Sequence, residues 1–177
     1  PLGGRRGELV QASLGPDTIT VDLRRTGSNV RQVFVNMPGS PALPVPFAVG
    51  DDPELNAPSS DVAIGLPVTI NARLANAGQV DRYTLRVPPG RAMTFRVQAR
   101  ELETSKLMAV ITVRDEKGRI LGRSGDEPLA EDLYNVNQSR TAGDPILRFT
   151  APEGVSQVTV TVEDLALRGG PGYAYRL

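Results

Sequence analysis

Residues 78–87, GQVDRYTLRV, begin as a glycine turn and continue as a stretch in which apolar and polar side chains alternate. Tyr83, Leu85 and Val87 fall on one face of an extended chain, and the polar residues between them fall on the other. This period of two is typical of a half-buried antiparallel strand. The stretch therefore predicts β structure, and it raises the question whether Asp81, at the junction, is a ligand or only stabilises the turn.

The same alternation recurs along the chain, at residues 19–23, 68–74, 93–99 and 158–162. In QVTVTVED, residues 157–164, we expect the valines to be buried and Thr159, Thr161 and Glu163 to face water. Turn sequences separate these stretches: PPG at 88–90, DEKG at 115–118, PEG at 152–154 and RGGPG at 168–172. Regularly spaced strands joined by tight turns predict an all-β fold, an antiparallel β-sandwich or barrel.

The composition excludes several classes of function. The chain of 177 residues has no Cys and no His, which rules out disulfides, zinc-thiolate sites and the commonest catalytic bases. Lys plus Arg equals Asp plus Glu at 20 each, so no overall charge favours nucleic acid. No apolar run approaches the roughly 18 residues of a membrane span. We therefore expect no catalytic site, and a carboxylate pair such as Glu163 and Asp164 is interpreted as a strand end.

The chain divides near residue 50. Residues 36–61 are rich in Pro, Gly, Ser and Asp, a composition that is typical of a domain boundary. Residues 1–50 form a short β-rich segment, with strands expected at 7–14, 18–23, 30–36 and 44–49. Residues 51–177 are long enough to fold as a domain on their own.

Two stretches interrupt the alternation. Residues 99–110, ARELETSKLMAV, have a mixed pattern that predicts a short helical turn before the next strand. Residues 123–145 form a long polar loop, and long loops within compact domains are usually functional or mobile. Its acidic residues are either solvated or make a second metal site: Asp126, Glu127, Glu131, Asp132 and Asp144.

Seven segments in order resemble the bacterial pre-peptidase C-terminal domain family: DPELN, GQVDRY, GRAMTFRVQAR, ITVRDEKGRIL, SGDE, DPILRFTAP and VEDLALRGGPGYAYRL. The resemblance covers residues 51–177 and implies an antiparallel β-sandwich of jelly-roll type. Residues 1–50 resemble part of an immunoglobulin-like domain that often precedes this module. The resemblance further implies a non-catalytic accessory module of a larger exported bacterial protein, which is secreted or lies at the cell surface or in the periplasm.

Similar domains hold calcium through the acidic lead-in and the aspartates of the glycine turn. Carried over to this sequence, the calcium ligands are Asp52, Glu54, Asn56 and Asp81. Such a site suits a cation that takes six to eight oxygen ligands. The sequence departs from the family pattern at Gln79, where an aspartate is usual, and at Leu55, where a proline is usual. The alternative is that these residues only accept backbone N–H bonds in turns, in which case no cofactor is required.

Three functions remain open at this point. The first is an accessory role in attachment, stability or interdomain packing, with other domains of the parent protein as partners and a monomeric chain. The second is a calcium-dependent module that binds an extracellular protein or polysaccharide, and the third, less favoured, is a hydrolase fragment. The chain has no Trp, and Tyr83, Tyr173 and Tyr175 look inward or corner-forming, which weakens a sugar-stacking role. A basic strip is the remaining candidate surface, either solvated or facing an acidic partner: Arg82, Arg86, Arg96 and Arg100.

Overall fold

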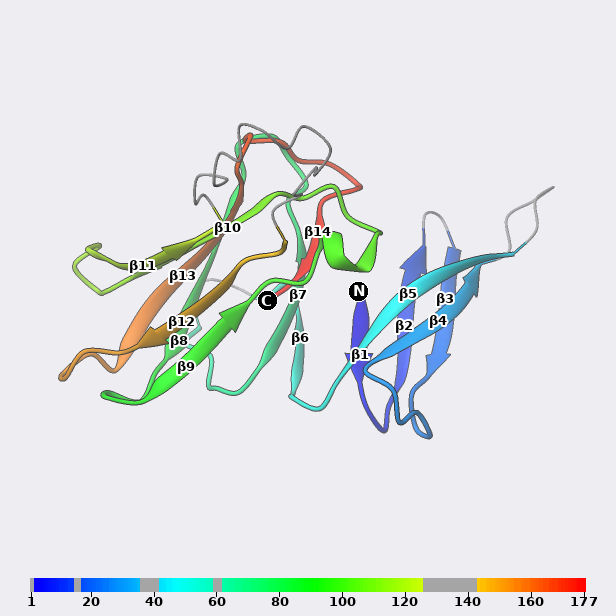
Figure 1. Ribbon diagram of the computed structural model, residues 1–177, viewed down its shortest axis with the longest axis horizontal. Coiled ribbons are helices and arrows are strands. Elements are labelled where there is room, and N and C mark those ends of the chain that lie inside the picture. Colours follow the sequence, from blue (N-terminus) through cyan, green and yellow to red (C-terminus); the bar gives the residue numbers. More distant parts are fainter. Residues whose placement is uncertain (1, 15–16, 36–41, 59–61, 126–142) are drawn as a thin grey trace, which may run out of the picture.

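The computed structural model describes residues 2–14, 17–35, 42–58, 62–125 and 143–177 (Figure 1). Within these ranges the chain is all-β, with fourteen strands and one short 3-10 helix. The predicted antiparallel β-sandwich is confirmed. No helix in the described ranges is long and apolar enough to span a bilayer.

The first unit, residues 2–50, is a small pair of sheets. Its strands are β1 (Gly3–Arg5), β2 (Leu9–Leu14), β3 (Asp17–Asp22), β4 (Val30–Val35) and β5 (Leu43–Gly50). One sheet has the order β1-β5-β4 and the other is the β2–β3 hairpin. The four strands expected here are present, and β1 is an addition that pairs parallel to β5. A small core lies between the sheets, with Leu23 and Phe47 among its buried residues.

The second unit, residues 54–177, is a larger two-layer sandwich (Figure 1). Its strands are β6 (Glu54–Asn56), β7 (Thr69–Arg73), β8 (Val80–Arg86), β9 (Ala92–Arg96), β10 (Ala109–Arg114), β11 (Ile120–Ser124), β12 (Ile146–Thr150), β13 (Gln157–Asp164) and β14 (Ala174–Arg176). One layer is the sheet β11-β10-β13-β8. The other layer combines β12-β9 with β14-β7-β6, which meet at a single bridge between Gln98 and Arg176.

The core of the second unit lies between these two layers. Tyr83 and Leu85 of β8 point inward, as the alternation in residues 78–87 predicts. They face the other layer, where the rings of Phe95 and Phe149 lie 5.8 Å apart, centroid to centroid. Apolar side chains from both layers are thereby removed from water, which is the main favourable contribution to folding.

Thr161 was expected to face water, and this expectation is wrong. The Thr161 side chain is 6% exposed, and its hydroxyl lies 3.5 Å from the carbonyl of Thr112. In the sheet, Thr161 stands directly between Arg82 of β8 and Thr112 of β10. Because β13 is a central strand, neighbours on both sides shield its outer face. The period-two pattern cannot reveal which strand will be central.

The helical turn expected within residues 99–110 is present as the 3-10 helix η1 (Arg100–Leu102). Asp144 caps it, because its carboxylate accepts hydrogen bonds from the N–H groups of Ala99 (2.6 Å), Arg100 (3.0 Å) and Glu101 (3.0 Å). Asp144 therefore has a structural role. The other acidic residues predicted for the loop lie outside the described residues: Asp126, Glu127, Glu131 and Asp132.

The predicted basic strip does not form. Arg82 and Arg86 lie on β8, whereas Arg96 lies on β9 in the other layer. Arg96 is also paired with Glu101, with 2.8 Å between nitrogen and oxygen. The arginines have similar spacing in the two stretches of sequence, but strands β8 and β9 belong to opposite sheets.

Candidate functional site at the junction of the two units

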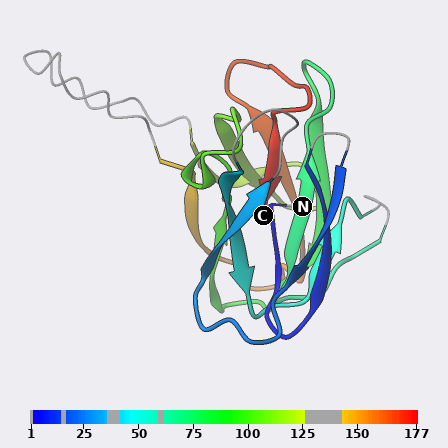
Figure 2. The ribbon, with the colours of Figure 1, turned by 90° about the vertical axis from the view of Figure 1, so that its right-hand side faces the viewer.

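Strand β1 lies on the side of the first unit that faces the second unit (Figure 1; Figure 2 gives the perpendicular view). Gly3 of β1 approaches the side chain of Arg176 on β14. Residues 51–53 alone connect β5 to β6. The two units are therefore joined by a very short segment and also touch through strands from opposite ends of the chain. Three of the four residues predicted to bind calcium lie in the link or in β6: Asp52, Glu54 and Asn56.

Arg176 is the centre of the junction. Its Nη2 lies 2.8 Å from Oε1 of Glu54, and its Nη1 donates to Oε2 of Glu54 at 3.2 Å. The same Nη1 donates to Oδ1 of Asn71 at 3.1 Å, and Asn71 donates in turn to Glu54 at 2.7 Å. The side chains of Arg176 and Glu54 are only 3% and 12% exposed. This is a buried, bidentate ion pair with an amide closing the ring of hydrogen bonds.

The guanidinium of Arg176 also touches the first unit. A Cβ added to Gly3 on β1 would collide with Nη1 of Arg176 and with the carbonyl of Ala48. At Gly50, the end of β5, an added Cβ would lie 3.4 Å from Nη2 of Arg176. Glycine at position 3 thus permits the sheet of the first unit to approach the buried arginine of the second.

The connecting segment is fixed to the first unit by its own contacts. Nε of Arg6 donates to the carboxylate of Asp51 at 2.7 Å, and Nε of Arg5 donates to the carbonyl of Asp51 at 3.2 Å. The N–H of Arg6 donates to the carbonyl of Gly50 at 2.7 Å. The link is therefore bonded on one side through Asp51 and on the other through Glu54.

Asp81 belongs to a second network, inside the sandwich. The hydroxyl of Tyr175 donates to Oδ2 of Asp81 at 2.6 Å, and the hydroxyls of Tyr83 and Tyr175 lie 2.7 Å apart. Because Tyr175 gives its proton to Asp81, Tyr83 is the donor between the two phenols. Burial, together with the nearby Asp81 carboxylate, raises the pKa of both tyrosines far above the ordinary value, so both remain donors at neutral pH.

Gln79 completes the turn that holds Asp81. Its amide nitrogen donates to Oδ1 of Asp81 at 2.6 Å, and its amide oxygen accepts the N–H groups of Ala75 (2.8 Å) and Asn76 (3.1 Å). A carboxylate at position 79 has no such donor to give. The departure from the family pattern at Gln79 therefore fits a turn in which the amide bonds to Asp81.

The four predicted calcium ligands do not share one site. Both oxygens of Glu54 accept from Arg176, and both oxygens of Asp81 accept from other side chains, while Asp52 and Asn56 are exposed. Over the described ranges no three acidic side chains are grouped so that they could hold a metal ion. This arrangement does not fit a cation that needs six to eight oxygens. Calcium binding stays a prediction. For Glu54 to bind calcium, its ion pair with Arg176 would have to break.

Thermal unfolding in calcium and in chelator distinguishes calcium binding from the hydrogen-bonded arrangement of Glu54 and Asp81 described above. Because the carboxylates of Glu54 and Asp81 are already bonded, we expect the same Tm in millimolar calcium chloride and in EDTA. A site filled at about 100 times its Kd adds about 2.7 kcal/mol. For a chain of this size that corresponds to a rise in Tm of about 5–10 °C. A rise of that size, lost in Glu54→Gln, would support calcium and contradict the arrangement described above.

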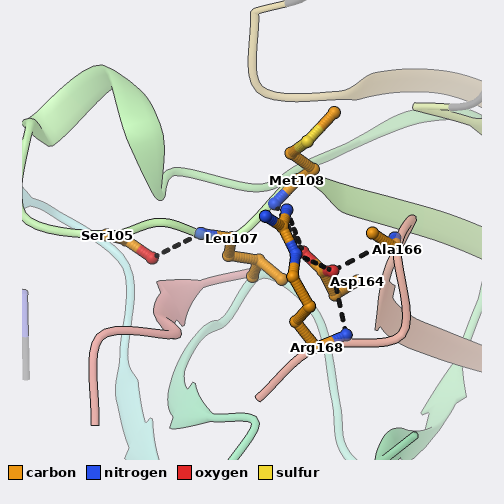
Figure 3. A network of polar contacts seen from close by, with 6 residues as sticks. All are labelled: Ser105, Leu107, Met108, Asp164, Ala166 and Arg168. Atoms are coloured by element: carbon orange, nitrogen blue, oxygen red, sulfur yellow. Dashed lines mark hydrogen bonds and ion pairs between the residues drawn. The ribbon is translucent and has the colours of Figure 1, made fainter. Parts of the chain in front are cut away.

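Asp164, at the end of β13, organises the closing segment of the chain (Figure 3). Its carboxylate accepts the N–H groups of Met108 (2.9 Å), Ala166 (3.1 Å) and Arg168 (3.0 Å), and Nε of Arg168 at 3.1 Å. Burial alone would raise the pKa of Asp164, but the hydrogen bonds from Arg168 and Met108 outweigh it and lower the pKa. Asp164 is thus a structural carboxylate, as expected for a strand end.

Sequence reasoning missed Arg176, Asn71 and the role of Tyr175. One signal was available: in YAYRL, residues 173–177, alternation places Tyr175 and Arg176 on opposite faces. If one of them is buried in the core, the other lies on the outer face of the same strand. What the alternation does not show is that the first unit covers that outer face.

No family model matches this chain, and no curated protein matches it. Among solved structures, it is similar to the pre-peptidase C-terminal domain of the collagenase from Bacillus anthracis. The two are 15% identical, with a TM-score of 0.44, and the match covers 72% of this chain and 96% of that one.

Proposed function

We propose that this chain is a non-catalytic accessory module of a larger exported protein, and that its two units act as one rigid spacer. The observation that carries the proposal is the buried Arg176–Glu54 pair, packed against Gly3 of the first unit. The proposal takes the accessory role and the export from the resemblance of residues 51–177 to secreted modules. Its partners are the other domains of the parent protein.

The junction supports rigidity for an energetic reason. Interfaces between domains of one chain commonly allow relative motion unless they are large or specifically bonded. A buried guanidinium and carboxylate are stable only while each remains paired, because an isolated buried charge is costly. Swinging the first unit away would expose this pair on one side, because Gly3 and Gly50 of the first unit lie against the guanidinium of Arg176. The junction therefore favours a single orientation of the two units.

A distance measurement between the units tests the proposal. Because the chain has no Cys, spin labels can be attached at Thr18→Cys in the first unit and Glu116→Cys in the second, both exposed positions. We expect a narrow distribution of label distances in this background. Adding Gly3→Val should broaden it, because the new side chain collides with Arg176.

The matched control is Gly27→Val, also in the first unit. A Cβ at Gly27 meets no atom within 4 Å, so this variant should keep the narrow distribution. A broad distribution before any glycine is changed would refute the rigid spacer. An equal broadening by both glycine variants would show that the junction itself is not responsible.

A further inference from the structure

The face of the sandwich away from the first unit is the outer face of the sheet β11-β10-β13-β8 (Figure 1). The first unit packs against the opposite layer, where Arg176 of β14 points outward and meets Gly3. In β8, β10 and β13 the residues that alternate with the core residues point away from the core. The charged side chains of the four strands on this outer face are four arginines and a glutamate: Arg82, Arg86, Arg114, Arg123 and Glu163.

Three of these arginines have no acidic partner in the described part of the chain. Arg123 lies 3.8 Å from Glu163, so this pair is neutral. The three without an acidic partner are Arg82, Arg86 and Arg114. Because acidic and basic residues are equal in number over the whole chain, at 20 each, this face carries a local excess of positive charge.

The hydrogen bonds that two of these arginines make are long. Nη1 of Arg82 donates to the carbonyl of Val80 at 3.3 Å, and Nη1 of Arg114 donates to the carbonyl of Gly118 at 3.4 Å. Both distances exceed the usual range of about 2.7–3.2 Å for N–H···O bonds, and both acceptors are neutral. A negatively charged ligand would therefore compete with these bonds at little cost, since charge-assisted hydrogen bonds are stronger.

The three arginines stand at the corners of a triangle, which we call the arginine triangle. Thr84 of β8 and Thr159 of β13 pair directly, and Arg114 of β10 pairs with Thr159 on the other side. Arg82 and Arg86 lie two residues before and after Thr84. With about 3.3 Å per residue and about 4.8 Å between strands, the Cα atoms at the corners are about 12–13 Å apart. The centre is then about 7 Å from each corner, a distance that the long side chain of arginine can span.

The arginine triangle fits a tetrahedral oxyanion. A guanidinium stays charged at physiological pH and binds oxyanions through two parallel N–H groups. A phosphate or sulfate ester has three terminal oxygens spread around its ester bond, one for each corner of the triangle, whereas a carboxylate has two. Thr159, half-buried near the centre, adds a hydroxyl donor.

The surroundings of the triangle favour a polysaccharide as the carrier of this ester. Protein interfaces have an apolar core in which aromatic residues are enriched. In the described strands of this face, Ile120 is the one large apolar side chain that is exposed. A sugar chain instead brings hydroxyl groups, which can bond to the threonine hydroxyls of the face. Charge and hydrogen bonds would here take the place of aromatic stacking.

We propose that the arginine triangle binds the phosphate or sulfate ester groups of an acidic polysaccharide, without calcium. This inference goes beyond the proposed function, since it gives the module a ligand of its own. It involves neither Gly3 nor the Arg176–Glu54 pair, which lie on the other layer and at the junction. Its failure would therefore leave the rigid spacer untouched.

Fluorescence anisotropy of labelled dextran sulfate, titrated with the full chain in EDTA, tests the proposal. We expect binding that weakens as the ionic strength rises, because salt screens exposed charges. Arg82→Gln, Arg86→Gln and Arg114→Gln should each raise the Kd about tenfold or more, since each removes a charge-assisted hydrogen bond. A second series uses phosphorylated dextran. Tighter binding of either polymer identifies the preferred ester and supports the proposal.

The matched control is Arg148→Gln. Arg148 is also exposed, but it lies on β12 in the other layer, so its replacement removes the same charge from a different face. It should leave the Kd nearly unchanged, and an unchanged Tm in every variant would show that the fold is intact. If Arg148→Gln weakens binding as much as the triangle variants do, the polymer responds to net charge alone and the triangle is not a site.

Further outcomes separate the ester from other ligands. A lack of binding at low ionic strength would overturn the proposal. Polygalacturonate, which carries carboxylates on a sugar chain, should bind about tenfold more weakly, because one guanidinium is left without an oxygen. Equal binding would rule out the tetrahedral oxyanion, and tighter binding of a phosphoserine peptide than of phosphorylated dextran would rule out the polysaccharide. The spin-label distances test the rigid spacer separately.

Discussion

Replacing Arg176 by Met is expected to lower the free energy of unfolding by about 3–5 kcal/mol, because it leaves the carboxylate of Glu54 buried and unpaired. In this chain such a loss corresponds to a fall in Tm of about 6–20 °C. The Met side chain retains much of the apolar stem, so the loss reports the missing charge rather than a cavity. Urea denaturation at neutral pH measures it directly.

Two comparisons make this prediction specific. Arg24→Met breaks the exposed pair with Asp22 and should change stability little, because water screens surface pairs. The double variant Glu54→Leu with Arg176→Met should recover most of the loss, since no buried charge remains unpaired. If the double variant is as unstable as Arg176→Met alone, the Arg176–Glu54 pair is not what stabilises the junction.

The second large effect is expected at Asp164. Asp164→Asn keeps the shape of the side chain but turns one acceptor oxygen into an NH₂ donor, which then faces the N–H groups that the carboxylate now accepts. Leaving buried donors without an acceptor costs about 1–3 kcal/mol each. We therefore expect a loss of about 3 kcal/mol of stability. Asp52→Asn, at an exposed carboxylate, is the control and should change stability little.

The pH dependence of Asp164 gives an independent check. Its pKa is lower in the folded chain than in the unfolded chain, so the unfolded state takes up a proton first as the pH falls. The stabilisation is therefore complete above the ordinary aspartate pKa of about 3.9 and is lost below it, towards the folded-state value. Asp164→Asn should lose stability less steeply than the parent chain between pH 5 and pH 2, and equal slopes would contradict the lowered pKa.

The strand positions and their inward faces were predictable because they depend on local alternation. Residues 78–87 and 157–164 were correctly predicted to contain strands, which are β8 and β13. The mixed pattern at 99–110 correctly predicted a short helical turn, which is η1. Thr161 failed because burial on the outer face of a sheet depends on neighbours that the strand's own sequence does not contain.

Local sequence patterns were enough to predict that this chain folds as β-strands with apolar inner faces, and they singled out Glu54 and Asp81 as candidate functional carboxylates. The partners of these two carboxylates are set by the three-dimensional fold. Glu54 bonds to Arg176, 122 residues away, and Asp81 bonds to Tyr175, 94 residues away. A carboxylate beside a turn looks the same in sequence whether it binds calcium, arginine or a phenol. Which of these it meets depends on how distant strands come together, because pairing across the sandwich joins residues that no local pattern relates.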